Sequence, residues 1–384
     1  MQSMRKARRA RDLGWITEPL LECGPLNAIT DLPGVLVGHS TLIQGSPGPL
    51  EVGVGPVRTG VTAIRPHPGN LFTHKVSAAV HVLNGFGKTV GFEQVRELGR
   101  LETPILLTNT LNTWRCADYL LDRMLPENPG IGIDTLGTLN PLVGECNDGW
   151  LNDIQGRHVG PAQVFQALDS AREGPVAEGN VGAGTGTLCY GFKGGIGTAS
   201  RVLPPERGAF TVGVLLQSNF GERRQLNMRG LPVGKLLDEQ KSRGEGEGVK
   251  GEMGEGGSCM MVVATDAPLS ARQLGRLARR APLGLARSGF TSSPGSGDYV
   301  IAFSTHQEEP GKDLLQAPQE RLRDEHATLG LLFQAVVEAV EEAVLNSLAA
   351  AETLAGRDGH VAQALPKSII QGWLSQQNGF NPAV

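Results

Sequence analysis

The sequence predicts a layered α/β fold. Short apolar segments with strand character alternate along the chain with stretches whose apolar residues recur at helical spacing. Glycine accounts for 53 of the 384 residues, about twice the ~7% of an average protein, which favours many tight turns and close backbone contacts. Hydrophobic residues make up 40% and charged residues 19%, a balance that excludes wholesale disorder.

In the N-terminal two thirds of the chain, strands are expected wherever apolar residues alternate or run together. The segments with this pattern are 31–43 (after a turn), 57–65, 76–84, 103–109 and 210–217. Helices are expected around 95–98 and over 111–125.

The last third begins with an unusual segment. Residues 234–257 contain no aromatic residue and no apolar periodicity, and seven of the last fourteen are glycine, so a flexible linker is expected. Apolar strands follow at 258–264 and 299–304. Ser270 is expected to cap a helix whose apolar face consists of Leu274, Leu277, Ala278 and Ala281. The strongest helical pattern covers 326–355.

Charge and composition exclude several classes of protein. With 35 basic and 39 acidic residues the net charge is −4, which argues against a nucleic-acid partner. No uncharged apolar run approaches the ~18 residues of a membrane span, so no membrane partner is expected. Five scattered cysteines fit free thiols in a reducing compartment, so we expect a cytoplasmic protein. The basic residues 5–11 precede no apolar segment and are expected to form a solvated arm.

Neither a metal nor a cofactor is expected. The eight histidines form no H-E-x-x-H motif. The glycine-rich stretches 181–186 and 194–197 lack the full G-x-G-x-x-G spacing, and the one complete match, 246–251, lies in the expected linker without a preceding strand. These glycines are interpreted as sites of close backbone packing.

Ser258 is the candidate nucleophile. It stands between the expected linker and a buried strand, directly after Gly256 and Gly257. A hydroxyl there can attack the carbonyl of Gly257, which has no Cβ to hinder the approach. Cleavage would leave Ser258 with a free α-amine of reference pKa ~7.7–8.0, near the working pH of a general base. One residue would then supply both nucleophile and base.

Five segments together resemble the peptidases of the DmpA/BapA type, the β-peptidyl aminopeptidases and L-aminopeptidase/D-amidases. They are DLPGVLVGH at 31–39, ECNDGWLNDI at 145–154, GNVGAGTGTLCYGFKGGIGTASR at 179–201, GSCMMVVATDAPL at 257–269 and SGDYVIAFST at 296–305. The resemblance implies a single domain over 1–384, a four-layer α-β-β-α sandwich that is similar to N-terminal-nucleophile hydrolases with a different strand connectivity. It also implies cleavage before Ser258 into an α chain, 1–257, and a β chain, 258–384, which assemble as homo-oligomers, often tetramers of αβ pairs.

The resemblance also implies site residues. Ser296 and Asp298 match the family's second serine and acid, although this chain has Asp where characterised peptidases often have Glu. Asn219 matches the oxyanion-hole asparagine. Acidic or carbonyl groups in the segment of Glu145, Asn147 and Asp153 are expected to hold the ammonium group of a small peptide or amino-acid amide substrate. Trp150 is the candidate for an aromatic residue that relatives place near the nucleophile.

Two alternatives to a self-cleaving aminopeptidase remain. An acyltransferase similar to ornithine acetyltransferase also cleaves itself, but before a threonine, so Ser258 counts against it. A catalytically silent binding protein would keep the chain uncut.

Overall fold

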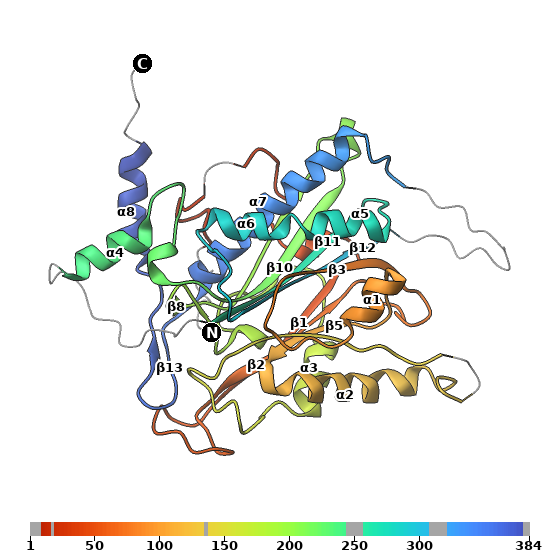
Figure 1. The fold of residues 1–384 in the computed structure, drawn as a ribbon, viewed down its shortest axis with the longest axis horizontal. Coiled ribbons are helices and arrows are strands. Elements are labelled where there is room, and N and C mark those ends of the chain that lie inside the picture. Colours follow the sequence, from red (N-terminus) through yellow and green to blue (C-terminus); the bar gives the residue numbers. More distant parts are fainter. Residues whose placement is uncertain (1–8, 17–18, 134–136, 243–255, 307–320, 379–384) are drawn as a thin grey trace, which may run out of the picture.

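The computed structural model describes residues 9–16, 19–133, 137–242, 256–306 and 321–378. Two main sheets lie within these residues (Figure 1). The four-stranded sheet has the order β1 (Leu36–Gln44), β2 (Val57–Arg65), β5 (Ile105–Asn109) and β6 (Leu142–Cys146). The six-stranded sheet has the order β4 (Arg100–Leu101), β3 (Val76–Gly85), β12 (Ser296–Ser304), β11 (Gly257–Thr265), β10 (Thr211–Asn219) and β9 (Ile196–Val202). Two short pairs complete the set: β7 (Leu188–Cys189) with β8 (Phe192–Lys193), and β13 (Leu354–Ala355) with β14 (Val361–Ala362).

Helices cover the outer faces of both sheets. Packed on the four-stranded sheet are α2 (Thr113–Met124) and α3 (Pro161–Asp169). The six-stranded sheet is covered by α5 (Ala271–Ala278) and α7 (Ala327–Ala350), and α6 (Ala281–Arg287) packs on α7. More peripheral are α1 (Phe92–Leu98), α4 (Val233–Ser242) and α8 (Lys367–Asn378). Helices, sheet, sheet and helices therefore follow one another, and the expected four-layer α-β-β-α sandwich is confirmed.

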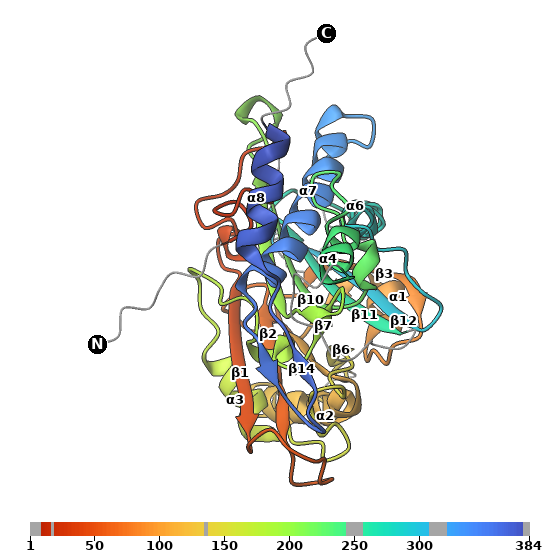
Figure 2. The same cartoon turned by 90° about the vertical axis from the view of Figure 1, so that its left-hand side faces the viewer.

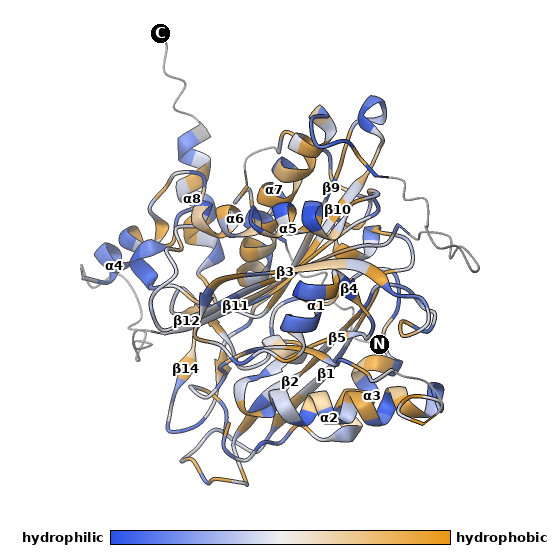
Figure 3. Cartoon of the chain, turned by 45° about the vertical axis from the view of Figure 1, so that its right-hand side comes forward, coloured by the Kyte–Doolittle hydropathy of each residue, from blue (hydrophilic) through white to orange (hydrophobic). Residues whose placement is uncertain are grey.

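The hydrophobic pattern of β11 shows why this strand lies in the middle of the molecule. Met260 and Val262 belong to the core between the two sheets, whereas Met261 and Val263 belong to the core beneath α7. Successive side chains of a strand point to opposite faces, so a strand covered on both faces is apolar throughout. The matching apolar character of α7 is visible in Figure 3.

Most expected elements are confirmed, and the missed ones have polar or short sequences. The strand expected at 57–65 matches β2, and Ser270 caps α5 by accepting a hydrogen bond from the Gln273 N–H. The sequence did not predict β6, β9 or α3. Polar residues such as Arg201 are buried in β9, where ion pairs rather than apolar character make burial tolerable.

The expected linker begins too early. Residues 233–242 form α4, which buries Val233 and Leu237, one turn apart on the same face. Two apolar residues one turn apart are too few to predict a helix next to a glycine-rich segment. Residues 243–255 lie outside the described residues.

The basic arm expected to be solvated is also corrected in part. Residues 5–8 lie outside the described residues, but Arg9 pairs with Glu178 at 2.9 Å and Arg11 with Glu342 at 2.7 Å. Glu342, on α7, is fully buried and also pairs with Arg201 at 2.8 Å. Carboxylates buried among apolar helices require such partners, and the arm supplies one of them.

This network predicts a pH-dependent contribution to stability. Burial opposes the charge of Glu342, but the hydrogen bond and positive charge of Arg11 together with Arg201 outweigh it and lower the pKa below the ordinary 4.5. The contribution is therefore complete above pH 4.5 and is lost as the pH falls through the lowered value. Glu342→Gln should reduce the free energy of unfolding at neutral pH by about 3–5 kcal/mol in urea titrations, with a smaller difference in acid.

The neighbouring Glu341 provides the control, because its pair with Arg287 is partly solvent-exposed. Glu341→Gln should cost at most about 1 kcal/mol. If both variants lost the same free energy of unfolding, the buried network would stabilise the protein no more than the exposed pair does.

None of the described helices combines the length and the apolar character needed to cross a membrane.

Candidate active site

Residues from three strands meet at one end of the six-stranded sheet. The antiparallel register of β10 and β11 places Asn219 opposite Ser258. The parallel register of β11 and β12 places Gly257 beside Ser296 and Cys259 beside Asp298. The four residues expected to act in catalysis are thus neighbours, although they are separated in the sequence.

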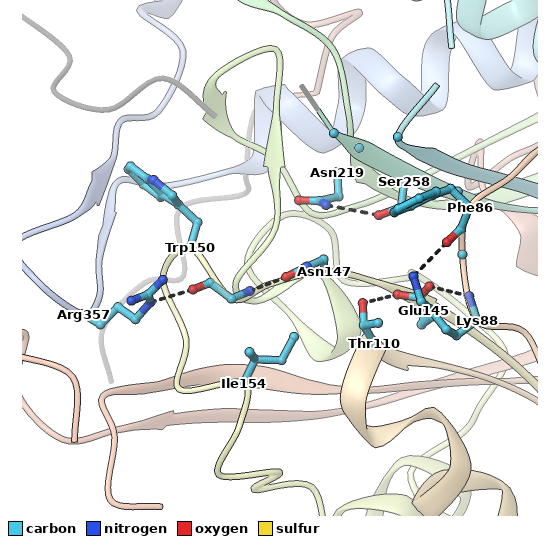
Figure 4. A pocket seen from close by; sticks show the side chains of 16 residues that line it. Phe86, Lys88, Thr110, Glu145, Asn147, Trp150, Ile154, Asn219, Ser258 and Arg357 are labelled. Carbon is cyan, nitrogen blue, oxygen red and sulfur yellow. Dashed lines mark hydrogen bonds between the residues drawn. The ribbon is translucent and has the colours of Figure 1, made fainter. Parts of the chain in front are cut away.

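A cavity of about 520 Å³ opens at this end of the sheet (Figure 4). Of the predicted site residues, Ser258, Gly257, Asn219, Glu145, Asn147 and Trp150 line it. Five other lining side chains, not singled out from the sequence, are those of Phe86, Lys88, Thr110, Ile154 and Arg357. A cavity of this size falls in the ordinary range for a small-molecule site.

The amide of Asn219 is oriented toward Ser258. Its Nδ2 donates to the Ser258 Oγ at 3.1 Å, and its Oδ1 accepts from the Leu188 N–H at 3.1 Å. Because Oδ1 already accepts a backbone hydrogen bond, the amide donor is the group that faces the hydroxyl. Both side chains are almost completely buried, at 3% exposure.

Lys193 secures the segment that carries Leu188, and sequence reasoning missed it. Its buried Nζ donates to the carbonyl oxygens of Gly184, Thr187 and Gly194 at 2.8–3.0 Å. Burial lowers the pKa of Lys193 to about 7. A lysine inside the otherwise apolar and glycine-rich stretch 179–197 was the available signal.

The glycines of this stretch pack backbone against backbone, as expected from the sequence. Gly195 has φ +147°, and a Cβ there would lie 2.0 Å from the carbonyl oxygen of Gly179. No other residue fits at that position without a shift of the chain.

Ser296 and Asp298 lie behind the nucleophile and do not line the cavity. Asp298 accepts hydrogen bonds from the Ser296 hydroxyl at 2.8 Å and from the Ser292 hydroxyl. Burial raises the pKa of Asp298 above its ordinary 3.8, although these hydrogen bonds act in the opposite direction. A Cβ on Gly257 would lie 3.1 Å from the Ser296 Oγ, so this hydroxyl sits next to the Gly257–Ser258 peptide.

Glu145 places a buried carboxylate on the cavity wall. It lies in β6, accepts a hydrogen bond from the Lys88 N–H at 2.8 Å, and accepts another from the Thr110 hydroxyl. Among the described residues, no Lys, Arg or His forms an ion pair with it. The carboxylate is therefore available to a cation that enters the cavity.

The other residues predicted around Glu145 have different environments. Asn147 lines the cavity and accepts from the Gly149 N–H at 2.9 Å. Trp150 lines the cavity while its ring stacks on His360, with centroids 4.5 Å apart. Asp153 is not brought to the cavity: its carboxylate binds His158 and the N–H groups of Gly53 and Gly156. Its place in the loop after Trp150 suggested a shared role, but the loop turns the side chain away.

Cys146 is a poor nucleophile despite its place beside Ser258. Burial raises the pKa of its thiol well above 9, so the reactive thiolate is scarce at neutral pH. Within the described part of the chain, no group of three or more His, Cys, Asp or Glu side chains is placed to hold a metal ion.

A serine hydroxyl that faces an amide donor at a cavity of an α-β-β-α sandwich is an arrangement suited to a serine hydrolase. The model of Peptidase family S58 matches residues 27–362. The chain is 42% identical over 369 residues to "Beta-peptidyl aminopeptidase BapA" of Sphingosinicella xenopeptidilytica. The matched region covers 93% of this chain and 89% of that protein.

Solved structures agree. A β-aminopeptidase of Burkholderia sp. has a TM-score of 0.85 and 39% identity, with 98% of this chain and 100% of that chain covered. The L-aminopeptidase D-Ala-esterase/amidase of Ochrobactrum anthropi, described as a variant of the Ntn hydrolase fold, has a TM-score of 0.85 and 38% identity, with 97% and 99% covered. The chain belongs to Peptidase family S58 and is an aminopeptidase.

Proposed function

We propose that this aminopeptidase is made as a precursor that cuts itself between Gly257 and Ser258. The Ser258 Oγ attacks the Gly257 carbonyl carbon, the peptide C–N bond breaks, and an ester links the two parts. Water then hydrolyses the ester, which leaves a carboxylate on Gly257 and an α-amine on Ser258. The observation that carries this proposal is the Asn219 amide, held 3.1 Å from the Ser258 Oγ at the cavity wall.

After cleavage the same oxygen attacks the substrate. The Ser258 Oγ adds to the carbonyl carbon of the substrate's first residue, and the α-amine of Ser258 takes up the hydroxyl proton. The leaving amine takes that proton, and water hydrolyses the acyl-Ser258 ester. The Asn219 amide donates to the oxyanion that forms at each tetrahedral stage.

Glu145 supports the choice of an N-terminal residue. Its carboxylate, which forms no ion pair with any described residue, is a partner for the substrate's free ammonium, which a blocked peptide lacks. Asn147 and Trp150 line the same cavity and would contact the first residue from the side.

Ser296 and Asp298 are proposed to position the nucleophile. The Asp298 carboxylate orients the Ser296 hydroxyl, and that hydroxyl lies beside the peptide that is cut, where the new amine would form. Neither residue needs to touch the substrate to act in this way.

Asp298→Asn tests this positioning role. It should lower kcat about 10²-fold, the scale of a misplaced acid–base group, with little change in KM. The wild-type kcat should decline as the pH falls through the pKa of the α-amine. Because burial raises the pKa of Asp298, this decline should become steeper at a lower pH, where the Asp298 carboxylate is protonated. The variant should keep only the first decline, and Asp298→Glu, which keeps a carboxylate, should retain both. An unchanged profile in Asp298→Asn would contradict the role.

A denaturing gel with intact-mass measurement tests the precursor. We expect chains of 257 and 127 residues, as counted from the proposed cleavage site in the 384-residue sequence. A single full-length chain after prolonged incubation would refute self-cleavage.

The residue removed is best sought with p-nitroanilides of L-Ala, D-Ala and β-Ala. The name of the Sphingosinicella relative points to β-amino acids, and that of the Ochrobactrum structure to L- and D-residues. Comparison of kcat/KM over the three substrates decides between them.

Assembly and location complete the proposal. We expect homo-oligomers of αβ pairs, which light scattering of the purified protein would measure. The described cysteines form no disulfide, and four of the five are buried thiols, which supports a reducing compartment such as the cytoplasm.

A further inference from the structure

The cavity has a second charged wall that the proposed chemistry does not use. Arg357 lines it, and Figure 4 shows this side chain and Glu145 on opposite sides, with Asn147 and Asn219 between them. Lys88, the other cationic side chain on the wall, has its Nζ turned to the Phe86 carbonyl oxygen at 2.8 Å. Arg357 is therefore the cation that faces Glu145 across the cavity.

Only part of the Arg357 guanidinium is engaged. Its Nε donates to the Gly149 carbonyl oxygen at 2.6 Å and its Nη1 to the Asp358 carboxylate at 2.8 Å. Its Nη2 has no hydrogen-bond partner within the described parts of the chain. The side chain is about a quarter exposed, so an anion in the cavity can reach it.

The backbone around Arg357 is held in place from several sides. Arg357 N–H donates to the Leu151 carbonyl oxygen at 3.1 Å, and Asp358 N–H donates to that of Gly48 at 2.7 Å. His360 binds the Trp150 carbonyl oxygen at 2.7 Å while the two rings stack. The β13–β14 hairpin, which carries Arg357, lies beside the four-stranded sheet (Figure 2).

We propose that Arg357 binds the C-terminal carboxylate of a short peptide whose ammonium is held by Glu145. A free di- or tripeptide has opposite charges at its two ends, which match the two walls, and its first peptide bond then faces Ser258. A guanidinium already fixed by two hydrogen bonds loses little freedom when it binds a carboxylate. This inference rests on the proposed function, and it assigns short peptides with a free carboxylate as the substrate class.

The test compares substrates that differ only in the terminal carboxylate. The dipeptide β-Ala-Ala, its C-terminal amide, and β-Ala p-nitroanilide are hydrolysed by wild type and Arg357→Gln, with the L-Ala series in parallel. Wild type should prefer the free acid over the amide about 10- to 100-fold in kcat/KM, the size expected for one charged hydrogen bond. In Arg357→Gln this ratio should fall to about one, through a rise in KM for the free acid.

Controls separate the possible failures. Arg287→Gln, which removes an exposed arginine on α6, should keep the wild-type ratio. The proposal would be overturned if wild type had the same kcat/KM for the free acid and the amide. It would also be overturned if Arg357→Gln lowered kcat/KM equally for both substrates. If Arg357→Gln does not fold, the test rests on the wild-type ratio of kcat/KM for acid over amide, which should decrease at high salt. Absence of p-nitroanilide hydrolysis in the wild type would instead refute the proposed function.

Discussion

Ser258→Ala should yield one uncut chain of 384 residues and lower kcat for p-nitroanilides by at least about 10⁴-fold. The substitution removes the Oγ that attacks the Gly257 carbonyl. In the uncut chain the backbone nitrogen of residue 258 stays in a peptide bond, so it cannot act as a base. Both activities are therefore lost together, since one atom starts both reactions. Intact mass reports the first loss and a p-nitroaniline assay the second.

Ser304→Ala provides the matched control. Ser304 lies at the far end of β12 and donates to the Ala267 carbonyl oxygen, remote from the cavity. This variant should be cut and active. Cleavage of Ser258→Ala after residue 257 would show that another group attacks that bond, and activity of the uncut protein would remove the α-amine from the mechanism.

Asn219→Ala should reduce kcat about 10²- to 10³-fold, the cost of about 2.7–4 kcal/mol measured for one oxyanion donor elsewhere. The amide acts most strongly on the charge that develops during attack, so KM should change little. The substitution also leaves the Leu188 N–H without its acceptor, which should cost a further 1–3 kcal/mol of stability, roughly.

Asn219→Asp separates the two effects. The carboxylate keeps an acceptor for the Leu188 N–H, so the free energy of unfolding of this variant should be close to that of wild type. The same carboxylate replaces the amide donor with a negative charge beside the oxyanion. Its kcat should be at least as low as that of Asn219→Ala. A nearly wild-type kcat in Asn219→Asp would exclude an oxyanion role for this side chain, whatever the stability of the alanine variant.

The predicted elements succeeded where one physical signal dominated. The dense apolar run after Ser258 predicted a strand, and β11 is a strand that is covered on both faces. α4 was missed because Val233 and Leu237 are a weak signal beside glycines, and β9 because buried polar residues such as Arg201 find partners far away in sequence. Local periodicity cannot report a partner that another segment supplies.

The site divides along the same line. Ser258 was found from its covalent neighbours, since Gly256 and Gly257 stand directly before it. Asn219, Ser296 and Asp298 came from the resemblance to a family. The strand registers place Asn219 beside Ser258, Ser296 beside Gly257 and Asp298 beside Cys259.

Of this protein, the sequence by itself determined the layered α/β fold, the family and the candidate nucleophile, because each is written in contiguous residues. Tertiary structure alone decided which polar groups share the cavity. It brought Arg357 to face Glu145, placed Lys193 under the segment that orients Asn219, and turned Asp153 away. The reason is physical: hydrogen-bond partners are chosen by distance in space, and strand pairing joins residues that lie far apart along the chain.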